Sequence, residues 1–278
     1  MKAIYSLSIA LTNRISALTM SFSARKILKM TSNLLMVAAL ALLAFSVPVH
    51  AANMDSRIEL SAKQSYVFKT YLQGDDIKIQ SRDGAVTLTG IVSENFHKSL
   101  AQETVADLPG VTSVDNRLEV KGAPPTANSD AWLRDKVKVA LLFHRSVSAR
   151  TTEVEVKDGI ATLRGEALSQ SQKELTTEYA RDVEGIKDVK NEMSVSTTSK
   201  KTPRTVGEKI DDASISAQVK MSLLNHRSTS VLNTKVKTKR GVVTVGGTAR
   251  NSAEMDLVTK LITDIDGVKS VKNRMTIE

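Results

Sequence analysis

The chain contains no cysteine, and only 4% of its 278 residues are aromatic. Without cysteine there can be no disulfide framework, no thiolate metal site, no cysteine nucleophile and no lipid attached to an N-terminal cysteine. The residues that are present, 41% hydrophobic and 25% charged, are typical of globular proteins and not of disordered ones. The length predicts one to three domains.

Motifs that carry enzyme chemistry are missing as well. The sequence has no nucleophile elbow, no P-loop, no His-Glu-x-x-His and no dinucleotide fingerprint. No Gly-x-x-Gly clamp of the kind found in KH modules lies between predicted helices, and aromatic residues that could stack on bases are scarce. We therefore expect neither an enzyme nor a nucleic-acid-binding protein, and we expect no cofactor and no small-molecule substrate.

The first 51 residues have the pattern of a signal peptide. Arg25, Lys26 and Lys29 precede an apolar run over residues 34–47, and Val49-His50-Ala51 has the small-x-small form of a cleavage site. The run of 14 residues is shorter than the roughly 20 needed to span a bilayer, but it suits a signal-peptide core. We expect cleavage after Ala51 and export to the periplasm. An uncleaved membrane anchor is the alternative.

Basic charge is concentrated in this leader and in the last third of the chain. Residues 1–51 hold five basic and no acidic residues, so the formal charge of +9 becomes +4 for residues 52–278, with 34 basic and 30 acidic residues. Residues 55–120 and 130–195 are net acidic, at −3 and −1, whereas residues 211–278 carry +4. This distribution does not support nucleic-acid binding by the whole protein.

A threefold internal repeat is the strongest pattern in the sequence, and repeats of this length indicate tandem structural units. A hairpin glycine is followed six residues later by a second glycine, twenty residues after that by a third, and six residues after the third by an asparagine. The three sets are Gly84, Gly90, Gly110 and Asn116; Gly159, Gly165, Gly185 and Asn191; and Gly241, Gly247, Gly267 and Asn273.

Each unit has the pattern helix, strand, strand, helix, strand. Hydrophobic residues alternate on both sides of the first glycine, as in a β-hairpin, and helical spacing precedes and follows the hairpin. We predict an α+β fold of three tandem modules, each with two helices on one face of a three-stranded mixed sheet. The predicted domains are 55–120, 129–195 and 211–278, with linkers at 121–128 and 196–210. We expect three separate units on flexible linkers, with docking between neighbours left open.

These motifs resemble the BON domain. The resemblance rests on Val-Thr-Leu-Thr-Gly90, Ala-Thr-Leu-Arg-Gly165 and Val-Thr-Val-Gly-Gly247 at the ends of the second strands, and on the later Gly-Val/Ile-x-x-Val-x-Asn. It implies an exported, non-enzymatic protein linked to envelope and osmotic stress, attached to phospholipid surfaces or acting as a periplasmic chaperone. Relatives of the osmotically inducible type have two units where this chain has three. We also expect the first unit to lack several residues between its helix, ending at Leu72, and its strand, beginning at Ile77.

The repeated glycines and asparagines have a structural interpretation and a ligand-binding one. Turn and helix-cap geometry explains the glycines, because all three units share them whatever their surface charge. The asparagines lie in the inward register of the last strand, where a polar side chain needs partners, so we expect each to tie a loop to the strand. Direct ligand binding is the alternative for both sets.

Lys235, Lys237 and Lys239 alternate with Val236 and Thr238, so the three lysines should lie on one face of a strand. Lysines that protect a solvated edge strand are one interpretation. The functional interpretation is a patch, extended by Arg240, for anionic lipid headgroups, each basic residue contributing ~1 kcal/mol near an anionic membrane.

His144-Arg145-Ser146 and His226-Arg227-Ser228 occupy equivalent places, 15 residues before the hairpin glycine. No further histidine or carboxylate recurs at ligand spacing, so we predict no metal site. Cations at the end of the first helix complement its dipole, which is one explanation. Anion binding by Arg145 and Arg227 is the other.

The leading functional hypothesis is a periplasmic adaptor that binds anionic phospholipid or envelope partners through its third unit. The alternative is a holdase chaperone or scaffold that recognises exported proteins and has no lipid role. Binding that survives physiological salt would favour the alternative, since screening weakens surface electrostatics more than hydrophobic capture.

Overall fold

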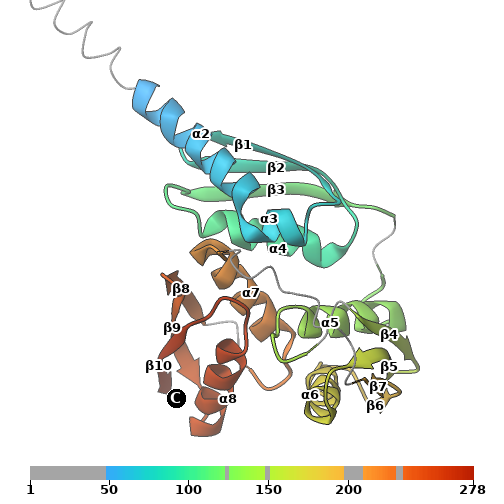
Figure 1. Cartoon of the computed structure of the whole chain (residues 1–278). Helices are drawn as coiled ribbons and strands as arrows, with labels where there is room; N and C mark the ends of the chain where they lie inside the picture. Colours follow the sequence, from blue (N-terminus) through green and yellow to red (C-terminus); the bar gives the residue numbers. More distant parts are fainter. Residues whose placement is uncertain (1–47, 123–124, 148–150, 197–208, 230–233) are drawn as a thin grey trace, which may run out of the picture. The chain divides into compact units, whose positions relative to one another are not determined.

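A computed structural model describes residues 48–122, 125–147, 151–196, 209–229 and 234–278 (Figure 1). The chain divides into two compact units, Met1–Asn53 and Met54–Glu278. The predicted signal peptide falls almost wholly outside the described residues, and all three repeats fall in the second unit. Within the described residues, no helix is both long and apolar enough to cross a membrane.

Three modules follow one another in the second unit, and their elements have the predicted order. The first comprises α2 (Pro48–Gln64), α3 (Tyr66–Thr70), β1 (Asp76–Arg82), β2 (Ala85–Val92), α4 (Asn95–Ala106) and β3 (Ser113–Val120). The second comprises α5 (Asp130–Leu142), β4 (Thr152–Lys157), β5 (Ile160–Ala167), α6 (Gln170–Arg181), β6 (Asp188–Asn191) and β7 (Ser194–Val195). The third comprises α7 (Asp212–Asn225), β8 (Lys235–Lys239), β9 (Val242–Ala249), α8 (Ser252–Thr263) and β10 (Ser270–Ile277).

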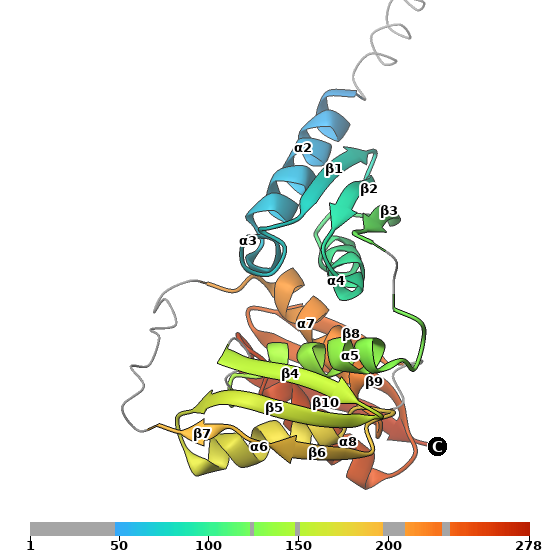
Figure 2. The same ribbon diagram turned by 90° about the vertical axis from the view of Figure 1, so that its right-hand side faces the viewer.

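Each module contains a mixed sheet whose second strand is central. In the first, β2 pairs antiparallel with β1 and parallel with β3. Figure 2 shows the second sheet broadside, with β5 between β4 and the short strands β6 and β7. The third sheet has the order β10-β9-β8 with the same directions. The predicted α+β fold of three tandem modules is confirmed.

A carboxylate in the first helix holds each hairpin turn. The turn residues Asp83 and Gly84 both have positive φ, the conformation of a type I′ turn, and both donate their backbone N–H groups to Asp55. Asp130 accepts the equivalent pair of hydrogen bonds in the second module and Asp212 in the third. The acidic residue stands 29 positions before the glycine in every module, a fifth repeated position that was not predicted from the sequence.

The prediction that the first unit has fewer residues between its helix and its first strand is confirmed, since five residues separate α3 from β1 and nine separate α5 from β4 and α7 from β8. The number of residues from the helix carboxylate to the first strand nevertheless agrees within two among the three modules. The first module fills this length differently, because α2 ends at Gln64 and is followed by α3, whose N-cap Ser65 accepts from the Phe68 N–H through its side chain.

The second glycine of the repeat is required because the backbone of the neighbouring strand lies too close to leave room for a side chain. Gly90 has a φ of +121°, and a Cβ there would lie 1.9 Å from the Asp76 carbonyl oxygen. Gly165 repeats the geometry against Thr151. The third glycine of each set has positive φ but follows the end of its helix by four residues instead of capping it, as Gly110 does after Ala106.

The repeated asparagines tie a helix, and not a loop, to the last strand. Asn273 donates to the Met255 carbonyl and the Thr259 hydroxyl of α8 at 3.0 Å each, and its Oδ1 accepts from the Met275 N–H. Asn116 and Asn191 make the matching bonds to α4 and α6. The prediction that each asparagine ties a loop to the strand was therefore wrong, because the element it ties to the strand is a helix.

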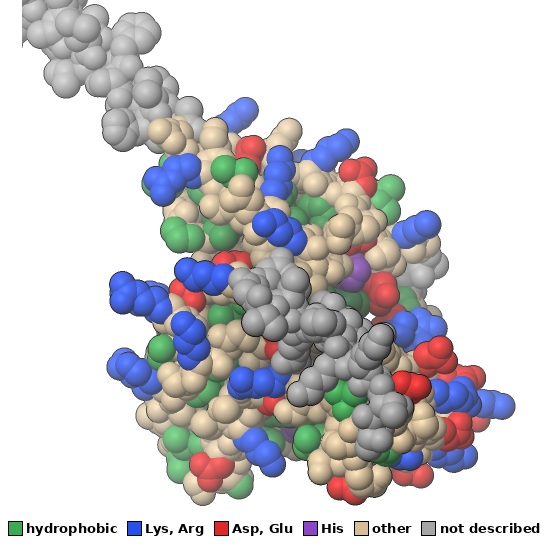
Figure 3. Space-filling view, viewed as in Figure 1, with side chains coloured by type: hydrophobic (Ala, Val, Ile, Leu, Met, Phe, Trp, Pro, Cys, Tyr) green, Lys and Arg blue, Asp and Glu red, His purple; other side chains and the backbone are tan. Residues whose placement is uncertain are grey.

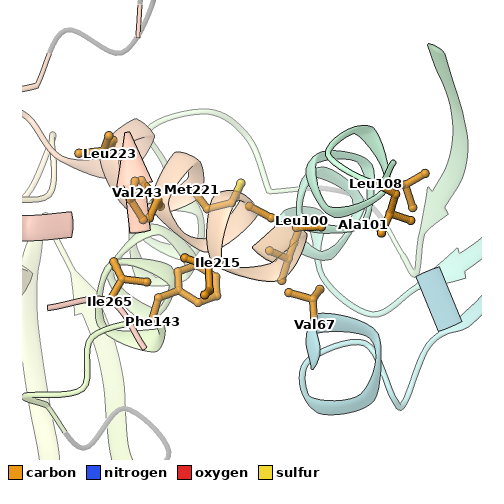
Figure 4. Close-up of a cluster of buried hydrophobic side chains, with 14 of the residues drawn as sticks. Val67, Leu100, Ala101, Leu108, Phe143, Ile215, Met221, Leu223, Val243 and Ile265 are labelled. Atoms are coloured by element: carbon orange, nitrogen blue, oxygen red, sulfur yellow. The ribbon is translucent and has the colours of Figure 1, made fainter. Parts of the chain in front are cut away.

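One buried apolar cluster joins the first and third modules and includes Val139 and Phe143 of the second. Helix α7 lies at its centre, and Figure 4 shows Ile215, Met221 and Leu223 of α7 within the cluster. The second module has a further cluster of its own around Leu163. Within the described residues the modules therefore dock on one another, the alternative that the sequence left open. Most of the linker residues, 123–124 and 197–208, lie outside the described residues.

Helix caps contribute to this packing. Ser129 caps α5 and Asp211 caps α7. Asp211 has a second role, since its Oδ2 accepts the Tyr66 N–H of α3 at 2.8 Å. The Val67 N–H donates to Ser214 Oγ at 3.1 Å, and Lys220 of α7 lies within 3.0 Å of Glu103 and 2.9 Å of Asp107. Polar contacts as well as apolar burial therefore hold the first module on the third.

Candidate functional site: the basic face of the third sheet

The third sheet has one face covered by helices and one that is open. Val236, Val243 and Val245 point toward the helices, where the two β9 valines are buried. The alternate residues of β8, the lysines at 235, 237 and 239, are exposed. Because neighbouring residues of a strand face opposite ways, these lysines lie on the open face, as the sequence predicts.

Strand β10 adds two more cations to the same face. Pairing places Lys237 opposite Thr244 and Thr244 opposite Lys272, so the two lysines share one row across the sheet. Lys235, Gly246 and Arg274 form the adjacent row in the same way. Lys272 and Arg274 are exposed, and no carboxylate occupies the open-face positions of β8, β9 or β10. We call Lys235, Lys237, Lys239, Lys272 and Arg274 the basic face.

The equivalent faces of the other modules are mixed in charge. In the second module the five positions hold Glu153, Glu155, Lys157, Lys190 and Glu192, and Arg164 of β5 is paired with Glu155 and Glu192 at 2.9 Å each. In the first they hold Lys78, Gln80, Arg82, Asp115 and Arg117, with Arg117 paired to Asp115. The third module alone of the three therefore presents a face of one sign.

Figure 3 shows Lys and Arg side chains gathered over the region that β8–β10 occupy in Figure 1. Arg240, at the tip of the hairpin, is exposed and donates its backbone N–H to Asp212 at 2.7 Å. The shared face of the β8 lysines was predicted from their alternation, whereas the contribution of Lys272 and Arg274 was not. The signal that could have found them is the Val271-x-Asn273-x-Met275 register, which places 272 and 274 on the outer face.

Arg145 and Arg227 lie elsewhere, at a junction between the second and third modules. Arg145 follows α5, and its guanidinium donates to the Thr263 carbonyl at the end of α8, while its N–H donates to the Asp264 carbonyl at 2.9 Å. Arg227 follows α7, and its guanidinium donates to the carbonyls of Arg181, Val183 and Ile186 after α6. The arginines thus complement the negative ends of helices in the other module and not of their own helices.

The two histidines are part of the same junction. His144 Nδ1 lies 3.3 Å from Asp264 Oδ2, and the ring stacks on Tyr179 with centroids 4.0 Å apart. His226 Nε2 lies 3.2 Å from Asp182 Oδ2. Burial lowers the pKa of His226, although the Asp182 carboxylate acts in the opposite direction. Burial by itself would raise the pKa of Asp264, but contacts from His144, Ser146 and Tyr179 hold it below its usual range.

Burial and the Asp264 and Asp182 carboxylates raise the pKa of Tyr179, so its hydroxyl stays protonated and donates to Asp264 at 2.8 Å. No group of three or more His, Cys, Asp or Glu side chains in the described part of the chain is arranged to hold a metal ion. The junction is built of side chains that satisfy helix ends, and the anion-binding role of Arg145 and Arg227 stays a prediction.

A model of the BON domain family matches residues 54–122, 129–197 and 211–278, so the matches cover most of the chain. The chain belongs to the BON domain family. Osmotically-inducible protein Y of Escherichia coli (strain K12) is 30% identical over 143 residues, which are 50% of this chain and 71% of that protein. An uncharacterised protein of Anaplasma centrale is 30% identical over 142 residues, 51% of this chain and 90% of that one.

The three BON domains align with the three modules.

Among solved structures, CdsD is a structural protein of the type III secretion system of Chlamydia trachomatis. The match covers 80% of this chain and 90% of the CdsD chain, at 16% sequence identity. Its TM-score of 0.23 is too low for that match to support any conclusion about this BON protein.

Proposed function

We propose that this BON protein is an exported, periplasmic, non-enzymatic binding protein that attaches to anionic phospholipid surfaces through the basic face. The observation that carries the proposal is the set of five exposed cations on two edge strands of one sheet, with no carboxylate among them. The name of the Escherichia coli relative, an osmotically inducible protein, supports a role under osmotic stress.

The physical reason is electrostatic. Each basic residue held near an anionic membrane contributes ~1 kcal/mol, so five contribute up to ~5 kcal/mol at low salt. Exposed charges are screened over about 8 Å at physiological ionic strength, so attachment of this kind weakens as salt rises. The open face has no aromatic side chain to insert, which favours attachment at the surface over penetration.

Co-sedimentation of residues 52–278 with anionic and zwitterionic liposomes, at low and physiological salt, tests the proposal. We expect anionic-selective binding that falls roughly a hundredfold at low salt when Lys235, Lys237 and Lys239 are changed to Gln, since about 3 kcal/mol is removed. Adding Lys272→Gln and Arg274→Gln should abolish it.

The second module offers a matched control. Lys157→Gln with Lys190→Gln neutralises two equivalent positions on a mixed face and should leave binding unchanged. Absence of binding to anionic liposomes under every condition would contradict the proposal. The holdase or scaffold hypothesis would then take its place, tested by suppression of client aggregation at physiological salt.

A further inference from the structure

The junction between the second and third modules is reciprocal. The segment after α5 docks on the end of α8, and the segment after α7 docks on the end of α6. Each docked segment brings a histidine to the aspartate that follows the other module's helix, His144 to Asp264 and His226 to Asp182. These two histidine–aspartate contacts therefore lie within the surface that joins the modules.

Both imidazoles are removed from solvent. The side chains of His144 and His226 are 2% and 7% exposed, and both line one small cavity with Tyr179, Asp182 and Ser222. The nitrogens that face the carboxylates, His144 Nδ1 and His226 Nε2, make no hydrogen bond of good geometry. A charged imidazole here would lose its hydration, and for His226 this loss outweighs the attraction of the Asp182 carboxylate.

The remaining nitrogens have partners that suit neutral rings. His226 Nδ1 accepts the Ser228 N–H at 3.2 Å, which requires a lone pair on that nitrogen. Protonation at Nδ1 would break this bond. His144 Nε2 lies 3.0 Å from the hydroxyl of Ser222, which can donate to that nitrogen or accept from it.

Charged groups surround the pair from each packed element. Asp182 follows α6, Asp264 follows α8, and Arg145 and Arg227 adjoin the two histidines in sequence. His144 and Arg227 oppose protonation of His226, whereas Asp182 favours it. Burial also opposes protonation and has the largest effect. The balance lowers the pKa of His226 in the docked protein.

We propose that this junction is a pH-sensitive docking site, closed when His226 is neutral and opened by its protonation. A histidine that resists protonation in the docked state stabilises docking fully above its undocked pKa of about 6.5. That stabilisation is lost as the pH falls from about 6.5 toward the lower docked value. For His226 alone, the ratio of docked to undocked protein changes by up to about tenfold per pH unit in this window.

Fluorescence energy transfer between the modules tests the proposal. The chain has no native cysteine, so Glu174→Cys on α6 and Asp256→Cys on α8, at exposed equivalent positions, accept a dye pair in the full chain. We expect transfer to fall as the pH is lowered from 8 to 5, and to be pH-independent after His144→Gln and His226→Gln. His97→Gln is the matched control, because His97 pairs with Asp75 at 2.6 Å within the first module and should leave the transition unchanged.

Imidazole NMR signals provide a second measurement should the double variant fail to dock at pH 8. Opening of the unsubstituted chain must then follow the titration of His226, resolved from His97 in the same spectrum. The proposal is overturned if energy transfer stays constant between pH 8 and 5. It is also overturned if a double variant that docks at pH 8 still opens at low pH, or if opening does not follow the titration of His226.

Discussion

Asp211 accepts the backbone N–H of Tyr66, 145 residues away in the sequence, at 2.8 Å. Its other oxygen accepts the Ser214 N–H, so one carboxylate serves the first turns of two helices, α3 and α7, in different modules. Negative charge is favourable at a helix N-terminus, because the unpaired N–H groups and the helix dipole both point there. Asp211 is thus a cap and a link between modules.

Asp211→Ala should therefore cost more than the loss of an ordinary cap. An N-cap contributes about 1 kcal/mol, so loss of two helix partners should reduce the free energy of unfolding by about 2 kcal/mol, measured by urea denaturation. Ser129→Ala is the control, because the Ser129 side chain caps α5 through the Trp132 N–H. Equal losses in the two variants would show that the Tyr66 bond contributes nothing.

Gly90→Ala should destabilise the first module by more than about 3 kcal/mol, since φ is +121° and the new Cβ would overlap the Asp76 carbonyl oxygen. Gly74→Ala in the same module meets nothing within 4 Å and has no such φ. It should be neutral or stabilise by about 0.5 kcal/mol. Thermal denaturation of both variants measures the difference, and a tolerated Gly90→Ala would refute the requirement for close approach.

Asn273→Asp keeps the size of the side chain but removes the two N–H groups that reach Met255 and Thr259. A carboxylate facing a helix carbonyl should cost about 2 kcal/mol or more, because the half-buried groups lose their partners. Asn251→Asp, which caps α8 as an acceptor, should cost little. Chemical denaturation compares the two, and the reverse order would contradict the helix-to-strand role of Asn273.

Asp264→Asn should reduce the acid sensitivity of the protein. The pKa of Asp264 lies below its usual 3.8 in the folded chain, so its contribution to stability is present above about pH 3.8. It is lost as the pH falls through the lower folded value, below the window proposed for His226. The variant should be less stable at pH 7 and lose less stability between pH 5 and 2. Asp256→Asn, exposed on the same helix, should retain the original pH profile in the same denaturation series.

The hairpins, caps and module order could be predicted because they depend on contacts close in sequence. Asp83-Gly84 specifies a turn through its own backbone, and Ser129 caps the helix that begins at the next residue. The alternation of Lys235, Lys237 and Lys239 is likewise a property of one strand, so their shared face followed from spacing. Each of these features would be the same in an isolated module.

The rest depends on which segments meet across distances that no spacing encodes. Lys272 and Arg274 join the lysines of β8 only because β9 pairs with both strands, and Arg145 reaches Thr263 across 118 residues. Ile215, Val219 and Leu223 of α7 have helical spacing, yet the serines and Gln218 of its other faces are also buried because two other modules pack around it. Local backbone preferences determine the module. The sum of many weak, long-range contacts determines how modules dock, and that sum can be evaluated only when all partners are in place.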